Sequence, residues 1–118
     1  MTIILTEKSS AAQSFAEALG AEKRGGYYEA SGYLITWCVG HLYELAEPET
    51  YRPEAEKWSL ETLPIIPERF LYRVIRKTAD RTEFVTSLLK KNSGEKIIIA
   101  TDADREGELI AREVIGMA

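Results

Sequence analysis

Four carboxylates, one arginine and one glycine lie together in residues 102–108 (DADREGE). Carboxylate oxygens are ligands that Mg²⁺ prefers, and two or three of them suffice because the ion keeps several waters. In an extended loop, side chains two positions apart point the same way, so Asp102, Asp104 and Glu106 are expected to converge on one ion. The spacing therefore predicts a divalent metal site, with Mg²⁺ as the expected ion.

Two neighbours of these acids suit supporting roles. Arg105 cannot bind a metal, but it can pair with a carboxylate or hold a phosphate through two hydrogen bonds. Gly107 has no Cβ, so the chain or a phosphate can approach closely where the loop turns into a helix. The dipole at a helix N-terminus also favours acidic residues. It accounts for one or two acids, but not for four at the end of a strand.

An EF-hand calcium loop is the competing interpretation of the same stretch. Its positions 1, 3, 5, 6 and 12 fall here on Asp102, Asp104, Glu106, Gly107 and Glu113. An EF-hand loop follows a helix, however, whereas the acids follow an apolar, β-branched run (IIIA, residues 97–100) typical of a strand. This interpretation is therefore disfavoured.

Two apolar runs are expected to position the chemistry. The strand over 97–100 delivers the acids beyond its carboxyl end, where ligands collect in open α/β sheets, and its composition predicts burial on both faces. Residues 2–5 form a second strand, followed by Glu7 and Lys8 in a turn. If the strands are neighbours, Glu7 faces the acids as a general acid or base and a further metal ligand, and Lys8 balances phosphate charge. The alternative for Glu7 is a surface acid in a first helical turn.

The remaining pattern predicts an α/β domain over residues 1–118 with a mostly parallel sheet, right-handed crossovers and flanking helices. Capping boxes at Ser10/Gln13 and Asp80/Glu83 predict the starts of two helices, which end at Gly20 and Asn92. The other expected elements are a hairpin over 27–39 turning at Ser31-Gly32, an irregular insertion over 40–68, a strand region over 70–75 and a closing helix. Expected anchors of the insertion are Trp58, Leu60, Leu63 and Ile65, and the closing helix carries Leu109, Ile110, Val114 and Met117.

Composition limits the classes of function. Hydrophobic residues make up 45% of the 118 residues and charged residues 29%, which is typical of one globular domain. The net charge of −4 argues against nonspecific nucleic-acid binding by the whole surface, although a bound metal would reverse the local sign. The only cysteine, Cys38, fits a reducing cytoplasm. One cysteine and one histidine, His41, are too few for the ligand spacing of a zinc site, so His41 is expected to have a structural role. No membrane span, P-loop or GxGxxG is present, so neither a membrane nor a nucleotide cofactor is expected.

Four stretches together resemble a known family. Glu7 after a first strand and Asp102-Ala103-Asp104 after a later one are similar to a Toprim domain, which has a Rossmann-like fold. The longer string over 100–108 (ATDADREGE) resembles the type IA DNA topoisomerase version of that domain. The stretches 6–9 (TEKS), 35–42 (ITWCVGHL) and 58–67 (WSLETLPIIP) point to its bacterial topoisomerase III branch.

The resemblance implies a role for each matching residue. Asp102 and Asp104, helped by Glu106, would hold Mg²⁺, and Arg105, Gly107, Glu108 and His41 would support the site or its phosphate. Glu7 would exchange a proton with the 3′ oxygen of a cut DNA strand, and Lys8 would lie near the phosphate. The nucleophilic tyrosine belongs to another domain of a longer chain, so this fragment alone is expected to be inactive.

The whole enzyme would act on single-stranded DNA segments in the bacterial cytoplasm, associated with the nucleoid, and would need no ATP. Two alternatives remain open. A Toprim primase or nuclease shares Glu7 and the paired aspartates, and a non-catalytic metal-dependent DNA-binding module is the third interpretation.

Overall fold

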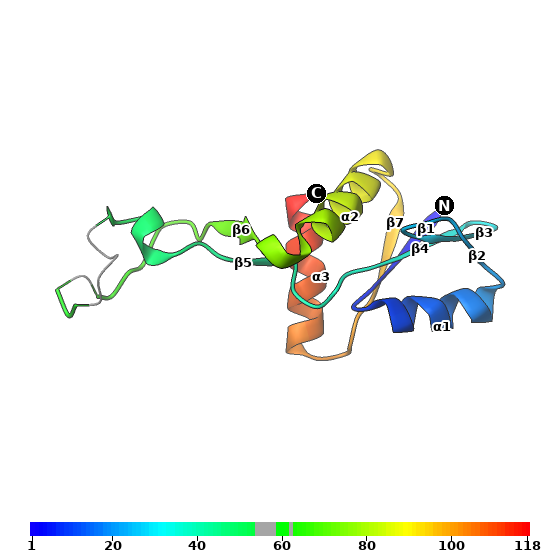
Figure 1. The fold of residues 1–118 in the computed structure, drawn as a ribbon, viewed down its shortest axis with the longest axis horizontal. Helices are drawn as coiled ribbons and strands as arrows, with labels where there is room; N and C mark the ends of the chain where they lie inside the picture. The colour runs from blue at the N-terminus through cyan, green and yellow to red at the C-terminus, as the bar shows by residue number, and fades with distance from the viewer. Residues whose placement is uncertain (54–58, 62) are drawn as a thin grey trace.

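The computed structural model describes residues 1–53, 59–61 and 63–118. Its main sheet has five strands in the order β2-β3-β4-β1-β7 (Figure 1). The central strand β1 pairs in parallel with both β4 and β7, and β2 and β3 add an antiparallel edge. The predicted α/β fold with a mostly parallel sheet is confirmed. The strand bounds are β1 Thr2–Thr6, β2 Glu22–Lys23, β3 Tyr28–Ala30, β4 Tyr33–Trp37 and β7 Lys96–Ala100.

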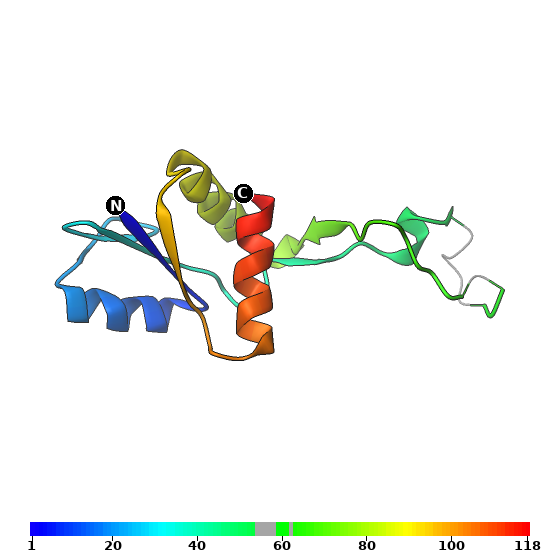
Figure 2. The same ribbon diagram turned by 180° about the vertical axis from the view of Figure 1, so that it is seen from behind.

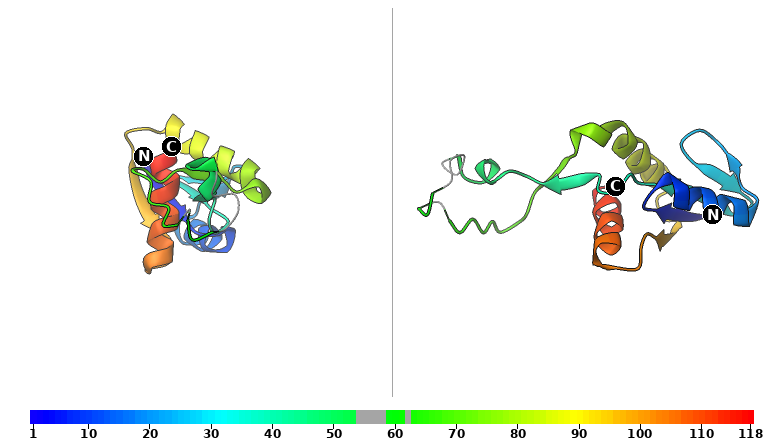
Figure 3. Two further views of the ribbon diagram at one scale, coloured as in Figure 1. Left: turned by 90° about the vertical axis from the view of Figure 1, so that its left-hand side faces the viewer. Right: turned by 60° about the horizontal axis from the view of Figure 1, so that its bottom comes forward.

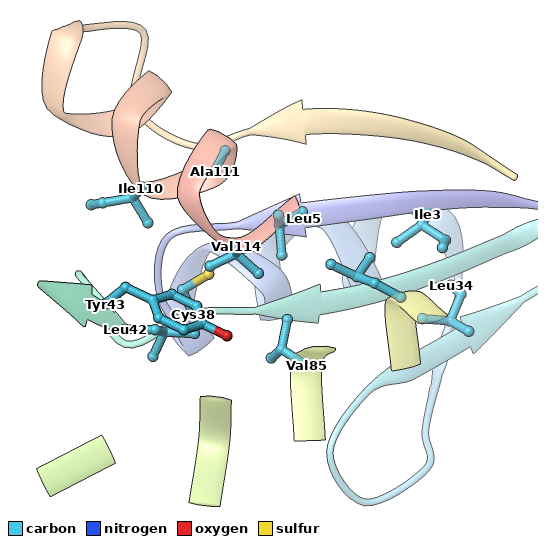
Figure 4. Close-up of a cluster of buried hydrophobic side chains, with 11 residues drawn as sticks. Ile3, Leu5, Leu34, Cys38, Leu42, Tyr43, Val85, Ile110, Ala111 and Val114 are labelled. Carbon is cyan, nitrogen blue, oxygen red and sulfur yellow. The ribbon is translucent and has the colours of Figure 1, made fainter. Parts of the chain in front are cut away.

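Three helices cover the two faces of this sheet. Helix α1 (Ser9–Leu19) lies on one face, and α2 (Ala79–Lys91) and α3 (Arg105–Met117) lie on the other (Figures 1 and 2). Successive side chains of β1 alternate between these layers, as a strand requires. Ile4 packs with the alanines of α1, whereas Ile3 and Leu5 pack with apolar side chains of α2 and α3 (Figure 4). The core of β1 therefore holds all three layers together.

The segment between β4 and α2 forms an arm that projects from this body. Strands β5 (Tyr43–Leu45) and β6 (Tyr72–Val74) pair antiparallel as a separate sheet at the base of the arm. Single 3₁₀ turns lie at Pro48–Thr50 and Arg76–Thr78. The arm runs along the long axis of the molecule, whose extents are 58 × 25 × 23 Å (Figure 3). The region near residue 72 forms a strand as predicted, but both strands lie outside the main sheet, and β5 falls within the stretch that was predicted to be irregular.

Several predicted details were wrong, each for a tertiary reason. Strand β7 is an edge strand of the described sheet, so Ile98 is 39% exposed rather than buried on both faces. Leu60 is 90% exposed and Leu63 is 39% exposed, because the arm extends away from the core; Trp58 lies outside the described residues. Of the four apolar residues named for the closing helix, Ile110 and Val114 are buried in α3, whereas Leu109 and Met117 are 45% and 44% exposed.

The two capping boxes also do not form. The helices begin earlier than predicted, with Lys8 as the N-cap of α1 and Thr78 as the N-cap of α2. Neither residue caps its helix through a side-chain hydrogen bond. The predicted helix ends are confirmed, since Gly20 takes the left-handed conformation with φ 65° after α1 and Asn92 caps α2. Among the described residues, no helix combines the length and apolar character needed to cross a membrane.

Candidate active site

The carboxyl ends of β1 and β7 lie side by side, and this brings two distant acids together. In the parallel register Thr6 pairs with Ala100, so the chain leaves both strands at the same edge of the sheet. The backbone amide of Asp102 donates a long hydrogen bond of 3.4 Å to Oε1 of Glu7. Residues separated by 95 positions thus meet, as the sequence analysis expected for neighbouring strands.

The acidic stretch is folded into a tight cap on α3 rather than extended. Asp104 is the N-cap, and its Oδ1 accepts a 2.7 Å hydrogen bond from the amide of Gly107. The amide of Asp104 in turn donates to the carbonyl of Asp102 at 2.8 Å. A Cβ on the buried Gly107 would collide with the backbone of Asp102. The missing Cβ therefore admits the chain itself, one of the two close approaches expected for this glycine.

Glu106 points to a different neighbour from the one predicted. It lies in the first turn of α3, and its Oε1 is 3.4 Å from Nε2 of His41. Nδ1 of the same ring is 3.6 Å from Oε2 of Glu113, a nearly buried oxygen without a hydrogen-bond partner in the described parts of the chain. His41 therefore links the loop after β4 to α3.

The expected convergence of three acids on one ion is not found. Because Asp104 begins a helix and Glu106 is helical, the alternation of an extended loop does not apply to them. Among the residues that the structure describes, no three histidine, cysteine, aspartate or glutamate side chains form a group that could hold a metal. This is a correction to the spacing argument.

The chemistry of the donors nevertheless fits Mg²⁺. Asp102 and Asp104 are exposed and line a shallow hollow of about 310 Å³, together with Ile99, Thr101, Ala103 and Glu108. Mg²⁺ keeps most of its waters and is commonly bound through one or two carboxylates. These two aspartates offer such a set, although one oxygen of Asp104 already accepts the capping hydrogen bond.

The cationic candidates lie at the starts of two helices. Lys8 is the exposed N-cap residue of α1, directly after Glu7, and Arg105 is the exposed first residue of α3. Glu108 is held by Arg112 one turn along α3, with 2.8 Å between Oε1 and Nε. Both cations can therefore reach an anion at the same edge of the sheet that carries Glu7 and Asp102.

A partly buried charge that no sequence pattern predicted lies at the end of β4. Arg81 of α2 lies half-buried against the end of β4, and burial lowers the pKa of its guanidinium to about 10. Nearby, burial raises the pKa of the Cys38 thiol to about 12, although the charge of Arg81 opposes that rise. No spacing signal marks Arg81, because a single arginine near a helix start is normally solvated.

Comparison with known proteins agrees with this architecture. The Toprim domain family matches residues 2–118. The chain is 45% identical over 115 residues to DNA topoisomerase 3 of Bacillus thuringiensis (strain Al Hakam), covering 97% of this chain and 16% of that protein. It is 47% identical over 118 residues to DNA topoisomerase 3 of Bacillus subtilis (strain 168), covering 99% of this chain and 16% of that protein. The chain thus spans about one sixth of the length of these relatives.

A solved structure shows the same fold. The chain superimposes on full-length topoisomerase I from Thermotoga maritima with a TM-score of 0.57 and 26% sequence identity, covering 97% of this chain and 16% of that one. With carboxylates after two neighbouring strands, and a family match along nearly its whole length, the chain belongs to the Toprim domain family.

Proposed function

We propose that this chain is the Toprim part of a type IA DNA topoisomerase active site, which cuts and reseals one DNA strand. The observation that carries the proposal is the meeting of Glu7 with Asp102 at adjacent parallel strand ends. Such an edge is where open α/β sheets bind ligands. The similarity along the chain to proteins named DNA topoisomerase 3 supports this choice over other Toprim enzymes.

Each residue of the edge has a role in the proposal. Asp102 and Asp104 would hold Mg²⁺, and the bound ion would supply positive charge at the DNA phosphate. Lys8 and Arg105 add charge beside that phosphate. Glu7 gives a proton to the 3′ oxygen when the phosphodiester bond breaks and takes it back when the bond reforms.

The nucleophile comes from outside this chain. A tyrosine hydroxyl of another domain gives its proton to water as its oxygen attacks the phosphorus, and the 3′ oxygen leaves with the proton from Glu7. A 5′-phosphotyrosyl bond replaces the broken bond and stores its energy. A second strand passes through the break before the reaction reverses, so no ATP is consumed. The partners are single-stranded DNA and the remaining domains of the same protein, in the bacterial cytoplasm.

The metal site is tested by calorimetry on the full-length protein. We expect weak Mg²⁺ binding, because few protein ligands are offered, and we expect Asp102→Ala combined with Asp104→Ala to abolish it. A matched control is Glu17→Gln, an exposed acid on α1 away from this edge. Unchanged Mg²⁺ binding in the double variant would refute the ligand assignment.

The catalytic role is tested on a single-stranded oligonucleotide. Glu7→Gln keeps the size of the side chain but removes its proton transfer, so cleavage and resealing should slow by about 10²- to 10⁴-fold while DNA affinity is retained. Cleavage at the normal rate would exclude Glu7 as the proton carrier. Relaxation of supercoiled DNA by the purified 118 residues alone would show that the nucleophile has been misplaced.

A further inference from the structure

Arg81 makes a set of contacts that a solvated surface arginine does not make. Its Nε donates to the carbonyl of Trp37 at 2.8 Å, and one terminal nitrogen donates to the carbonyl of Gly26 and to Oγ1 of Thr36, both at 2.9 Å. The guanidinium also lies over two rings, 3.9 Å from the centroid of Trp37 and 5.0 Å from that of Phe84. Within the described ranges its partners are neutral oxygens and aromatic rings.

The segment that Arg81 holds is also the support of the Glu7 turn. The amide of Cys38 donates to the carbonyl of Thr6 at 2.9 Å, and the amide of Gly40 donates to the carbonyl of Glu7 at 3.1 Å. The hydroxyl of Thr6 lies 3.3 Å from the carbonyl of Thr36. A continuous series of contacts therefore runs from Arg81 through residues 36–40 to the backbone on both sides of the Glu7 peptide.

The free-energy cost of burying Arg81 indicates that its contacts do more than attach α2 to the sheet. Taking a guanidinium out of water is unfavourable, and an apolar side chain of similar volume commonly packs as well or better. What only arginine supplies is a rigid, planar fork that fixes several acceptors at once. A lysine at this position keeps the charge but cannot hold Trp37, Gly26 and Thr36 in one plane.

We propose that Arg81 and Thr36 are positioning residues for Glu7: the guanidinium fork holds the end of β4, and that backbone holds the Glu7 turn in register with Asp102. This inference rests on the proposed function, because it concerns the residue that exchanges the proton. In this proposal Arg81 and Thr36 act through the backbone of β4 and not through the DNA, so their effect falls on the rate of the chemical step and not on binding.

The test uses Arg81→Lys and Thr36→Val in the full-length protein, each with a matched control. Thr36→Ser keeps the hydroxyl, and Arg73→Lys alters an exposed arginine that pairs with Glu44 in the arm. Small displacements of a reacting group can lower rates by about 100-fold. We expect single-turnover cleavage to fall about 10- to 100-fold in both test variants, with DNA affinity within about twofold of wild type. Thr36→Ser and Arg73→Lys should remain near the wild-type rate.

Hydrogen exchange gives a readout that does not depend on activity. The amide of Gly40 should lose protection in Arg81→Lys and Thr36→Val, because it donates to the Glu7 carbonyl, while amides within α1 should not. Wild-type cleavage rates in both test variants, or parallel losses of rate and DNA affinity, would overturn the inference. If the wild-type protein cuts no DNA, the proposed function fails, and unchanged protection of Gly40 would separately overturn the positioning role. If Arg81→Lys does not fold, the cleavage rate and the Gly40 protection of the near-isosteric Thr36→Val decide whether the positioning role holds.

Discussion

Replacing Gly107 with alanine tests the close packing of the acidic stretch on α3. Gly107 lies in the first turn of the helix and is buried. An added Cβ would lie 2.9 Å from both the amide nitrogen and the carbonyl carbon of Asp102, and closer still to its carbonyl oxygen. All three atoms belong to the backbone, so no flexible side chain can move aside.

The magnitude follows from two opposing effects. Alanine is favoured over glycine within a helix by about 1 kcal/mol, and less in a first turn. Overpacking against rigid atoms costs about 1–3 kcal/mol. Moving the loop outward would also break the hydrogen bond from Gly107 to Asp104, and losing an N-cap costs about 1 kcal/mol. The clash outweighs the helix preference, and we expect the free energy of unfolding to fall by about 1–3 kcal/mol.

The assay is urea unfolding of the wild-type and variant proteins, with Gly116→Ala as the control. Gly116 lies in the same helix, but an added Cβ there meets nothing within 4 Å. Its replacement should leave stability unchanged or raise it by a few tenths of a kcal/mol. If Gly107→Ala were as stable as Gly116→Ala, the close approach of Asp102 to α3 would be refuted.

Two further predictions concern the cap and the buried thiol. Asp104→Ala removes the acceptor for the amide of Gly107 and should lower the free energy of unfolding by about 1 kcal/mol. Asp104→Asn keeps an acceptor and should lower it by less. Equal losses of stability in urea unfolding would contradict the role of Asp104 as the cap. Burial raises the pKa of Cys38 from 9.0 to about 12, so at pH 8 its thiolate fraction is about a thousandfold below that of the unfolded chain. Alkylation should therefore require unfolding, and fast labelling of the native protein would contradict the burial. The pKa of Cys38 is higher in the folded protein than in the unfolded chain, so the stability that comes from keeping the buried thiol neutral is complete below pH 9. That stability is lost as the pH rises from 9 towards 12, and Cys38→Ala should reduce the loss.

The proposed site could be located from the sequence to a large extent, although its geometry could not. The sequence alone shows that the aspartates follow one apolar run and that Glu7 follows another. These positions indicate a site because open α/β sheets bind ligands beyond the carboxyl ends of their strands. Glu106, however, does not lie where its spacing predicted. Whether Asp104 continues a loop or starts a helix depends on its hydrogen bond to Gly107, and the periodicity of side chains changes with that choice.

Long-range packing decided what local patterns could not. The sequence alone determined the α/β class, the alternation of strands and helices, and which acids follow strands, since these depend on side-chain periodicity within short segments. Only the tertiary structure decided that β1 lies beside β7, so that Glu7 meets Asp102, and that β7 forms an edge. It also placed Arg81 of α2 against the end of β4. These outcomes depend on contacts between residues about 40 to 95 positions apart, which no short stretch of sequence encodes.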